Sequence, residues 1–174
     1  MQLQYKTAPQ DEVSDSIGLL ISILVRYPEL GTINYDPELQ QLRFTFIFSG
    51  VLDEEKMVNF KDMVVASIEA YNSLENRSPL VTEVRFNPCE EFTMLEIIRD
   101  VGTMSQEELS MLIELVHSNF KKDLIFEKNE YLLEEDLLIQ EELIEHMLEN
   151  IKLSFPQKNL IAFREDGRVL VFNK

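Results

Sequence analysis

The hydrophobic and polar positions of the chain alternate between the period of a helix and the period of a strand. Apolar residues recur at helical spacing before residue 28, after residue 53, at 105–120 and at 130–153. Shorter apolar runs bounded by turn residues predict strands at 33–35, 42–48, 80–87, 91–98, 124–126, 160–163 and 168–172. The pattern therefore predicts four helices and about seven strands.

The order of these elements repeats along the chain. A helix followed by a hairpin (an αββ unit) is predicted at 8–48, at 53–98 and at 130–172, and the repetition is open to duplication or to coincidence. Residues 41–127 also follow the order βαββαβ of a ferredoxin-like unit. Both descriptions predict one α+β fold with an antiparallel or mixed sheet.

The domain organisation follows from the placement of the chain breakers. No linker rich in Gly, Ser or Pro divides the chain, so we expect a single domain over 1–174. Four helices mostly on one face of the sheet would leave the other face uncovered, and that face is where we expect function to lie.

Local signals predict how individual helices begin and pack. Asp53 suits the N-cap of the second helix, and Ser105 with Glu108 forms a capping-box pattern for the third. The apolar arc of 130–153 is wide, so we expect this helix to contact the sheet on one side and another helix or a second subunit on the other.

Charge and composition exclude several classes of partner. Acidic residues outnumber basic ones 32 to 16, giving a net charge of −16, which disfavours direct binding to nucleic acid and to anionic membranes. The longest apolar run, 17–25, is too short to span a bilayer, and one cysteine is typical of a cytoplasmic location. Residues 127–149 hold nine acids against Lys128, which is consistent with an acidic nucleic-acid mimic or with an ordinary solubilising surface.

Motifs for catalysis, cofactors and metals are weak throughout. Glu114 and His117 form a single Glu-x-x-His, whereas a carboxylate-bridged dimetal site needs two. Cys89 stands next to Glu90 and Glu91, which disfavour a reactive thiolate, and neither a nucleophile elbow nor a phosphate-binding loop is present. We expect no cofactor, no metal site and no enzymatic activity.

The uncovered face of the sheet provides the candidate binding residues. Arg43, Thr45 and Ile47 alternate with the apolar residues of their strand, and Arg85 has the same outward position in another strand. Arginines there could receive a small anion or an acidic partner segment, or pair with strand carboxylates, and Ile47 favours a protein contact.

The leading hypothesis from the sequence is a non-enzymatic cytoplasmic domain for assembly or protein interaction, self-associating as a homo-oligomer. Its alternatives are a small-molecule-binding domain or enzyme with a pocket between sheet and helices, and an acidic mimic that binds a basic partner. No resemblance to a known family decides among them.

Overall fold

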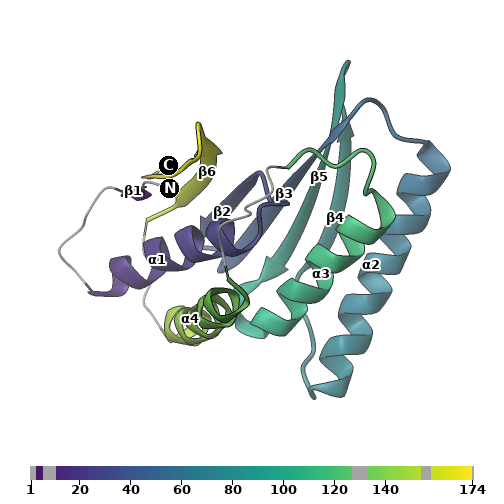
Figure 1. Cartoon of the computed structure of the whole chain (residues 1–174). Helices are drawn as coiled ribbons and strands as arrows, with labels where there is room; N and C mark the ends of the chain where they lie inside the picture. Colours follow the sequence, from purple (N-terminus) through teal and green to yellow (C-terminus); the bar gives the residue numbers. More distant parts are fainter. Residues whose placement is uncertain (1–2, 6–10, 127–132, 154–157, 174) are drawn as a thin grey trace.

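The structure is a computed structural model that describes residues 3–5, 11–126, 133–153 and 158–173 (Figure 1). Helices and strands succeed one another as the periodicity predicts, with two differences: a short strand is added at the start, and no strand forms at 124–126. In chain order the elements are β1 (Leu3–Tyr5), α1 (Asp11–Arg26), β2 (Thr32–Asp36), β3 (Gln41–Ser49), α2 (Glu54–Leu74), β4 (Thr82–Pro88), β5 (Phe92–Asp100), the 3₁₀ helix η1 (Val101–Thr103), α3 (Gln106–Asn119), α4 (Glu134–Lys152), β6 (Leu160–Glu165) and β7 (Arg168–Asn173).

One sheet joins elements from both ends of the chain, and the α+β class is confirmed. Its strand order is β1-β7-β6-β2-β3-β5-β4. The pairs from β7 to β4 in this order are all antiparallel, whereas β1 pairs with β7 in parallel. Each of α1, α2 and α4 precedes a hairpin in the chain. Whether these αββ units arose by duplication stays a prediction.

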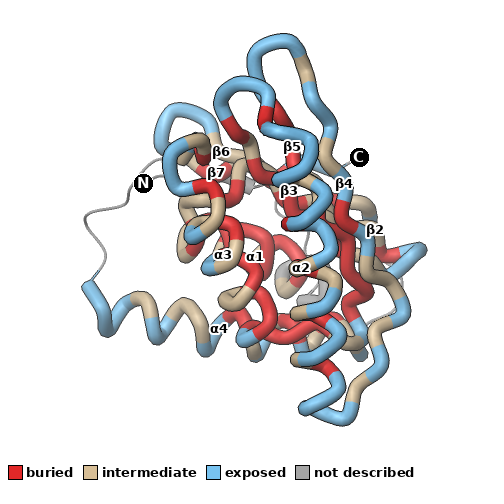
Figure 2. The backbone as a smooth tube through the Cα atoms, turned by 90° about the vertical axis from the view of Figure 1, so that its right-hand side faces the viewer, coloured by how far each residue is buried: buried red, intermediate tan, exposed pale blue. Residues whose placement is uncertain are grey.

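The helices pack on one face of the sheet and bury a continuous apolar core there (Figure 1). α1 contacts β2, β6 and β7, while α2 contacts β4. Phe44, Phe46 and Phe48 of β3 are fully buried because every second side chain of the strand points toward the helices. Figure 2 shows the buried residues concentrated between the helices and the strands. None of the described helices is long and apolar enough to cross a membrane.

The strand predicted at 124–126 is wrong, and so is the complete βαββαβ order of 41–127. Leu124 forms only an isolated bridge with Phe48, supported by a 2.9 Å hydrogen bond from the Ile125 amide to the Ile47 carbonyl. The physical reason is that β2 already pairs with β3 from Gln41 to Thr45, so only the last residues of β3 have an edge free for this segment.

α4 lies outside the first helical layer, which corrects the packing expected for 130–153. Its main contacts are with α1, α3 and η1 rather than with a strand. The approach to α1 is close, because a Cβ atom at Gly18 would lie 3.0 Å from the Met147 sulfur. Ile144, Leu148 and Ile151 face this contact and are buried. Residues 130–132 of the predicted helix lie outside the described residues.

Candidate functional site

The candidate site is the sheet face that the helices leave uncovered. Phe44 lies opposite Ile33 and Ile97 on the helix side, so the alternate residues of these strands point the other way. We call that side the open face. Its strand residues are Thr32, Asn34, Arg43, Thr45, Ile47, Glu83, Arg85, Met94, Glu96, Ile98, Ile161, Phe163, Leu170 and Phe172.

The structure places all four residues singled out from the sequence on the open face. Thr45 lies opposite Glu96 of β5, and Glu96 lies opposite Arg85 of β4, so three strands bring these side chains into one row. Thr45 is only 8% exposed. A role of these residues in partner binding stays a prediction.

Carboxylates accompany both arginines of this row. The Arg43 Nε atom lies 3.3 Å from a Glu96 oxygen, and Arg85 forms a 2.5 Å contact with Glu83. Asn87 adds a 2.6 Å hydrogen bond to Glu96. The centre of the open face is therefore charged but balanced, which suits a polar protein contact better than the capture of a free anion.

A strip of apolar side chains continues the open face over β6 and β7. Ile161 lies opposite Phe172, and Phe163 lies opposite Leu170. The rings of Phe163 and Phe172 stack with their centroids 5.6 Å apart, and Phe172 remains 49% exposed. We call these four residues the apolar strip.

A cavity of about 410 Å³ adjoins one end of the apolar strip. Phe163 and Ile47 form its floor on the sheet, and Ile125 and Phe126 form part of its wall. The Ile125 side chain is 54% exposed although it is apolar. At the base, Gly31 leaves room because a Cβ atom there would lie 3.4 Å from Ile47 Cδ1. The cavity can accept an apolar side chain of a partner.

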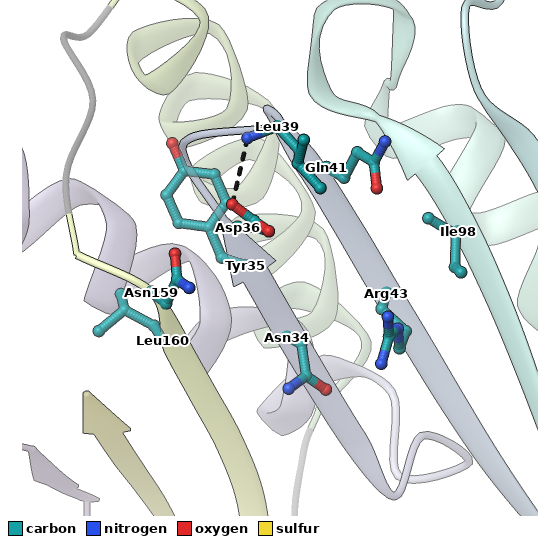
Figure 3. A pocket seen from close by; sticks show the side chains of 9 residues that line it. All are labelled: Asn34, Tyr35, Asp36, Leu39, Gln41, Arg43, Ile98, Asn159 and Leu160. Atoms are coloured by element: carbon teal, nitrogen blue, oxygen red, sulfur yellow. Dashed lines mark hydrogen bonds between the residues drawn. The ribbon is translucent and has the colours of Figure 1, made fainter. Parts of the chain in front are cut away.

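A second, smaller cavity of about 90 Å³ lies near the turn between β2 and β3 (Figure 3). Its lining mixes polar residues, among them Asn34, Gln41 and Arg43, with apolar ones such as Ile98 and Leu160. Asp36 also lines it, but one of its carboxylate oxygens accepts a 3.1 Å hydrogen bond from the Leu39 amide. Burial, followed by the nearby Asp36 carboxylate, raises the pKa of Tyr35. The space suits ordered water rather than an organic ligand.

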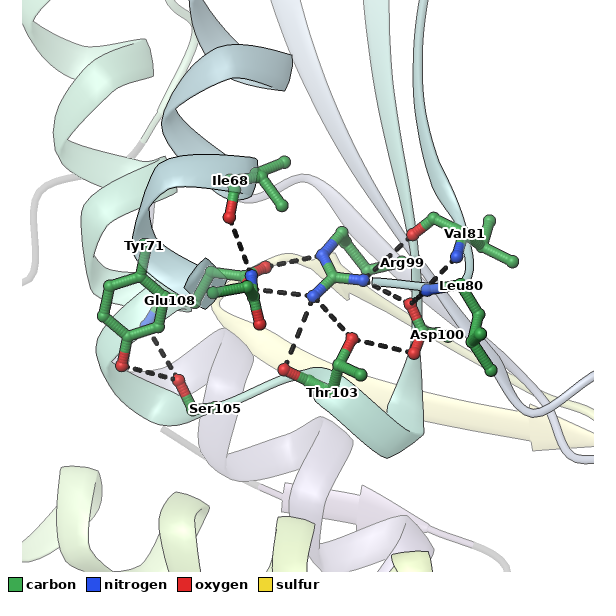
Figure 4. A network of polar contacts seen from close by, with 10 residues as sticks. Ile68, Tyr71, Leu80, Val81, Arg99, Asp100, Thr103, Ser105 and Glu108 are labelled. Carbon is green, nitrogen blue, oxygen red and sulfur yellow. Dashed lines mark hydrogen bonds and ion pairs between the residues drawn. The ribbon is translucent and has the colours of Figure 1, made fainter. Parts of the chain in front are cut away.

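A buried ionic network was missed at the sequence level (Figure 4). The Arg99 guanidinium donates to both Glu108 oxygens, at 2.7 and 2.8 Å, and both side chains are completely buried. It also donates to Asp100, to the Val81 carbonyl at 2.9 Å and to the Thr103 hydroxyl at 2.9 Å. The available signal was that Arg99 falls on the apolar side of β5, in step with Leu95 and Ile97.

The same network controls the ionisation of Asp100. Burial by itself raises the pKa of this carboxyl group. Hydrogen bonds from the Val81 amide and the Thr103 hydroxyl, together with the Arg99 charge, outweigh burial and hold its pKa below the usual range. The network therefore joins β5, η1 and α3 through buried ion pairs and hydrogen bonds.

The residues weighed for catalysis have separate local partners. His117 Nδ1 lies 3.1 Å from Glu29, and Glu114 instead accepts a 3.2 Å hydrogen bond from Ser118. The Cys89 sulfur contacts only a backbone carbonyl, that of Asn87, at 3.9 Å. Over the described residues, no group of three or more His, Cys, Asp or Glu side chains is arranged to hold a metal ion.

Comparison with protein-family models, with curated proteins and with solved structures found no match. The open face is the most distinctive surface of this chain, because it combines a balanced row of charges, an apolar strip and an adjoining apolar cavity.

Proposed function

We propose that this chain is a non-enzymatic assembly domain of the cytoplasm whose open face binds protein. The observation that supports the proposal is the apolar strip, whose stacked Phe163 and Phe172 rings stay partly exposed beside a cavity of about 410 Å³. Exposed apolar surface of this kind, bordered by polar residues, is typical of interaction sites.

The composition of the open face also favours a protein over a small ligand. Burying an aromatic or branched aliphatic side chain stabilises a complex by roughly 1.5–3 kcal/mol before the entropic cost of association. Phe172 and Ile125 offer such side chains, and the ion pairs of Arg43 and Arg85 supply the polar surroundings. An apolar centre with a polar border is the usual anatomy of a protein interface.

Site-specific photo-crosslinking tests the proposal in the cells that express the protein. A photoreactive phenylalanine at Phe172 should form a defined adduct with one protein, and Leu170→Glu should abolish the adduct by placing a charge in the apolar strip. The matched control carries the same amino acid at Leu74, which is 82% exposed at the end of α2. Equal adducts at both positions, or none at Phe172, would refute the proposal.

A second candidate function is carried by the exposed acidic residues of α4. Glu135, Asp136, Glu142 and Glu149 are exposed on this outermost helix, as expected for a domain that mimics nucleic acid toward a basic partner. A photoreactive residue at Glu142 should then crosslink a basic protein at low salt and lose it at high salt. An adduct that survives high salt, or no adduct, contradicts this function.

A further inference from the structure

β4 forms one outer edge of the sheet. β4 ends the strand order and pairs only with β5, so the backbone groups along its other edge have no strand partner among the described residues. Unpaired edges of this length are templates for pairing with another chain. Pro79 and Pro88 bracket the segment and limit the usable edge to the residues between them.

The sequence of β4 is complementary to itself about Val84. In an antiparallel pair of two β4 strands related by a two-fold axis at Val84, each Glu83 faces Arg85 of the other copy. In the same pair Val84 faces Val84, and Thr82 faces Phe86. Opposite charges and apolar or β-branched residues across strands each contribute roughly 0.2–1 kcal/mol. The edge therefore presents matching chemistry to a second copy of this chain.

Charge also selects the register of such a pair. Sliding the two-fold axis by one residue centres it on Glu83 or on Arg85, which places two glutamates or two arginines directly opposite each other. Like charges in this position are destabilising. The Val84 register is the one of these three in which all four charged side chains meet an opposite charge.

We propose that two copies of this chain dimerise through β4, antiparallel about Val84, and so form one sheet that continues through both molecules. A two-fold axis perpendicular to the sheet keeps the helices of both copies on the same side. The open faces then become one surface across the dimer. This goes beyond the binding of a partner on the open face, because the β4 edge is a separate surface.

The helix above the edge is compatible with this dimer. α2 contacts β4 and lies beside α3 at the β4 end of the sheet (Figure 1). Its side toward α3 carries Lys56 and Tyr71, which contact Phe120 and Ser105. Val58 and Val65, seven residues apart, share the opposite flank, and Val58 is 53% exposed. In the dimer these flanks of the two α2 helices approach each other.

The charge complementarity gives a test by charge reversal. Glu83→Arg leaves two arginines facing two arginines, and Arg85→Glu leaves two glutamates facing two glutamates, so each variant alone should be monomeric. Mixed in equal amounts, the two variants should form a heterodimer, since each arginine then meets a glutamate. The double variant Glu83→Arg with Arg85→Glu should dimerise like the wild type. Both side chains are about half exposed, at 48% and 53%, so the fold should survive.

Sedimentation equilibrium measures these masses over micromolar to millimolar concentrations, because an edge-to-edge contact of this size should bind on the order of micromolar. Glu135→Arg reverses an exposed charge on α4, away from β4 and α2, and is the matched control, which should not change the dimer. Phe172→Glu alters the open face and should leave dimerisation intact, so failure of one proposal is distinguishable from failure of the other.

Backbone hydrogen exchange supplies an independent readout of the edge. Amides of residues 82–86 should exchange more slowly in the wild type at high concentration than in Glu83→Arg. A wild type that stays monomeric at millimolar concentration would overturn the proposal. So would a Glu83→Arg variant that still dimerises, or an equimolar mixture of the two variants that stays monomeric.

Discussion

Arg99 fastens three neighbouring parts of the molecule through a single planar group. It reaches Glu108 on α3, Thr103 in η1 and the Val81 carbonyl next to β4. Asn72 of α2 is drawn into the same cluster by its 2.7 Å hydrogen bond to Glu108. A buried charge of this kind is tolerated only because every arm of the guanidinium has a partner.

Removing Arg99 should destabilise the fold strongly. Arg99→Met leaves the buried Glu108 carboxylate uncompensated, and we expect the free energy of unfolding to fall by about 3–5 kcal/mol. Arg99→Met combined with Glu108→Leu should cost less than Arg99→Met alone, because the stranded charge is gone. Arg85→Met, which removes an exposed arginine, should cost at most about 1 kcal/mol. Urea unfolding of the wild type and the three variants measures these losses of stability. Equal losses of unfolding free energy in Arg99→Met and Arg85→Met would contradict the prediction.

Asp100 gives the network a pH dependence whose sign follows from its lowered pKa. In the unfolded chain this carboxyl group binds a proton at a higher pH than in the folded protein. Its stabilising contribution is therefore complete above the unfolded pKa of about 3.9 and is lost as the pH falls through the folded pKa. The wild type should lose stability more steeply below about pH 4 than Asp100→Asn does. Parallel unfolding curves for the two proteins in acid would rule this out.

At the scale of single elements, two predicted N-caps behave differently. The Ser105 hydroxyl accepts a 3.2 Å hydrogen bond from the Glu108 amide, as the capping-box pattern predicts. The second half of the box is absent, since the Glu108 carboxylate binds Arg99 and Asn72 instead. Asp53 occupies the N-cap of α2 without a side-chain hydrogen bond to the helix.

This difference predicts unequal effects of alanine at the two caps. Ser105→Ala should lower the free energy of unfolding by about 1 kcal/mol, because one amide of α3 loses its acceptor. Asp53→Ala should cost about 0.5 kcal/mol or less, since only its charge near the helix end is lost. Thermal unfolding of the two variants gives the comparison. A larger loss at Asp53 than at Ser105 would contradict the assigned roles.

Helices and strands could be predicted where the hydrophobic periodicity extended over many residues. The prediction failed where pairing with other strands decided the structure. The alternation in 42–48 predicted a strand with one buried face, and β3 has it. Leu124 to Phe126 has the composition of a strand, but β2 pairs with most of the edge of β3 that this segment would need. β1 spans three residues, which is too short for any period to be visible, and only its pairing with β7 defines it.

At the scale of the whole molecule, the sequence located the open face but not what surrounds its residues. Because alternate residues of a strand point to opposite faces, the sequence was enough to place Arg43, Thr45 and Ile47 on one side. It could not show that Glu96 lies between Arg43 and Arg85, because that depends on the order of strands in the sheet. The apolar strip combines two strands of one hairpin, and its cavity needs the distant Ile125 and Phe126, so neither was visible as a local pattern.

The sheet pairs strands from the start of the chain with strands near its end. Leu3 of β1 lies beside Val169 of β7. In the middle of the sheet, β2 pairs with β6, which is more than a hundred residues away in the chain. Contacts this distant slow folding, because a long loop must close before they form. On a ribosome the early hairpin of β2 and β3 therefore emerges with one edge unfilled, and the sheet is completed only when the last strands have left the exit tunnel.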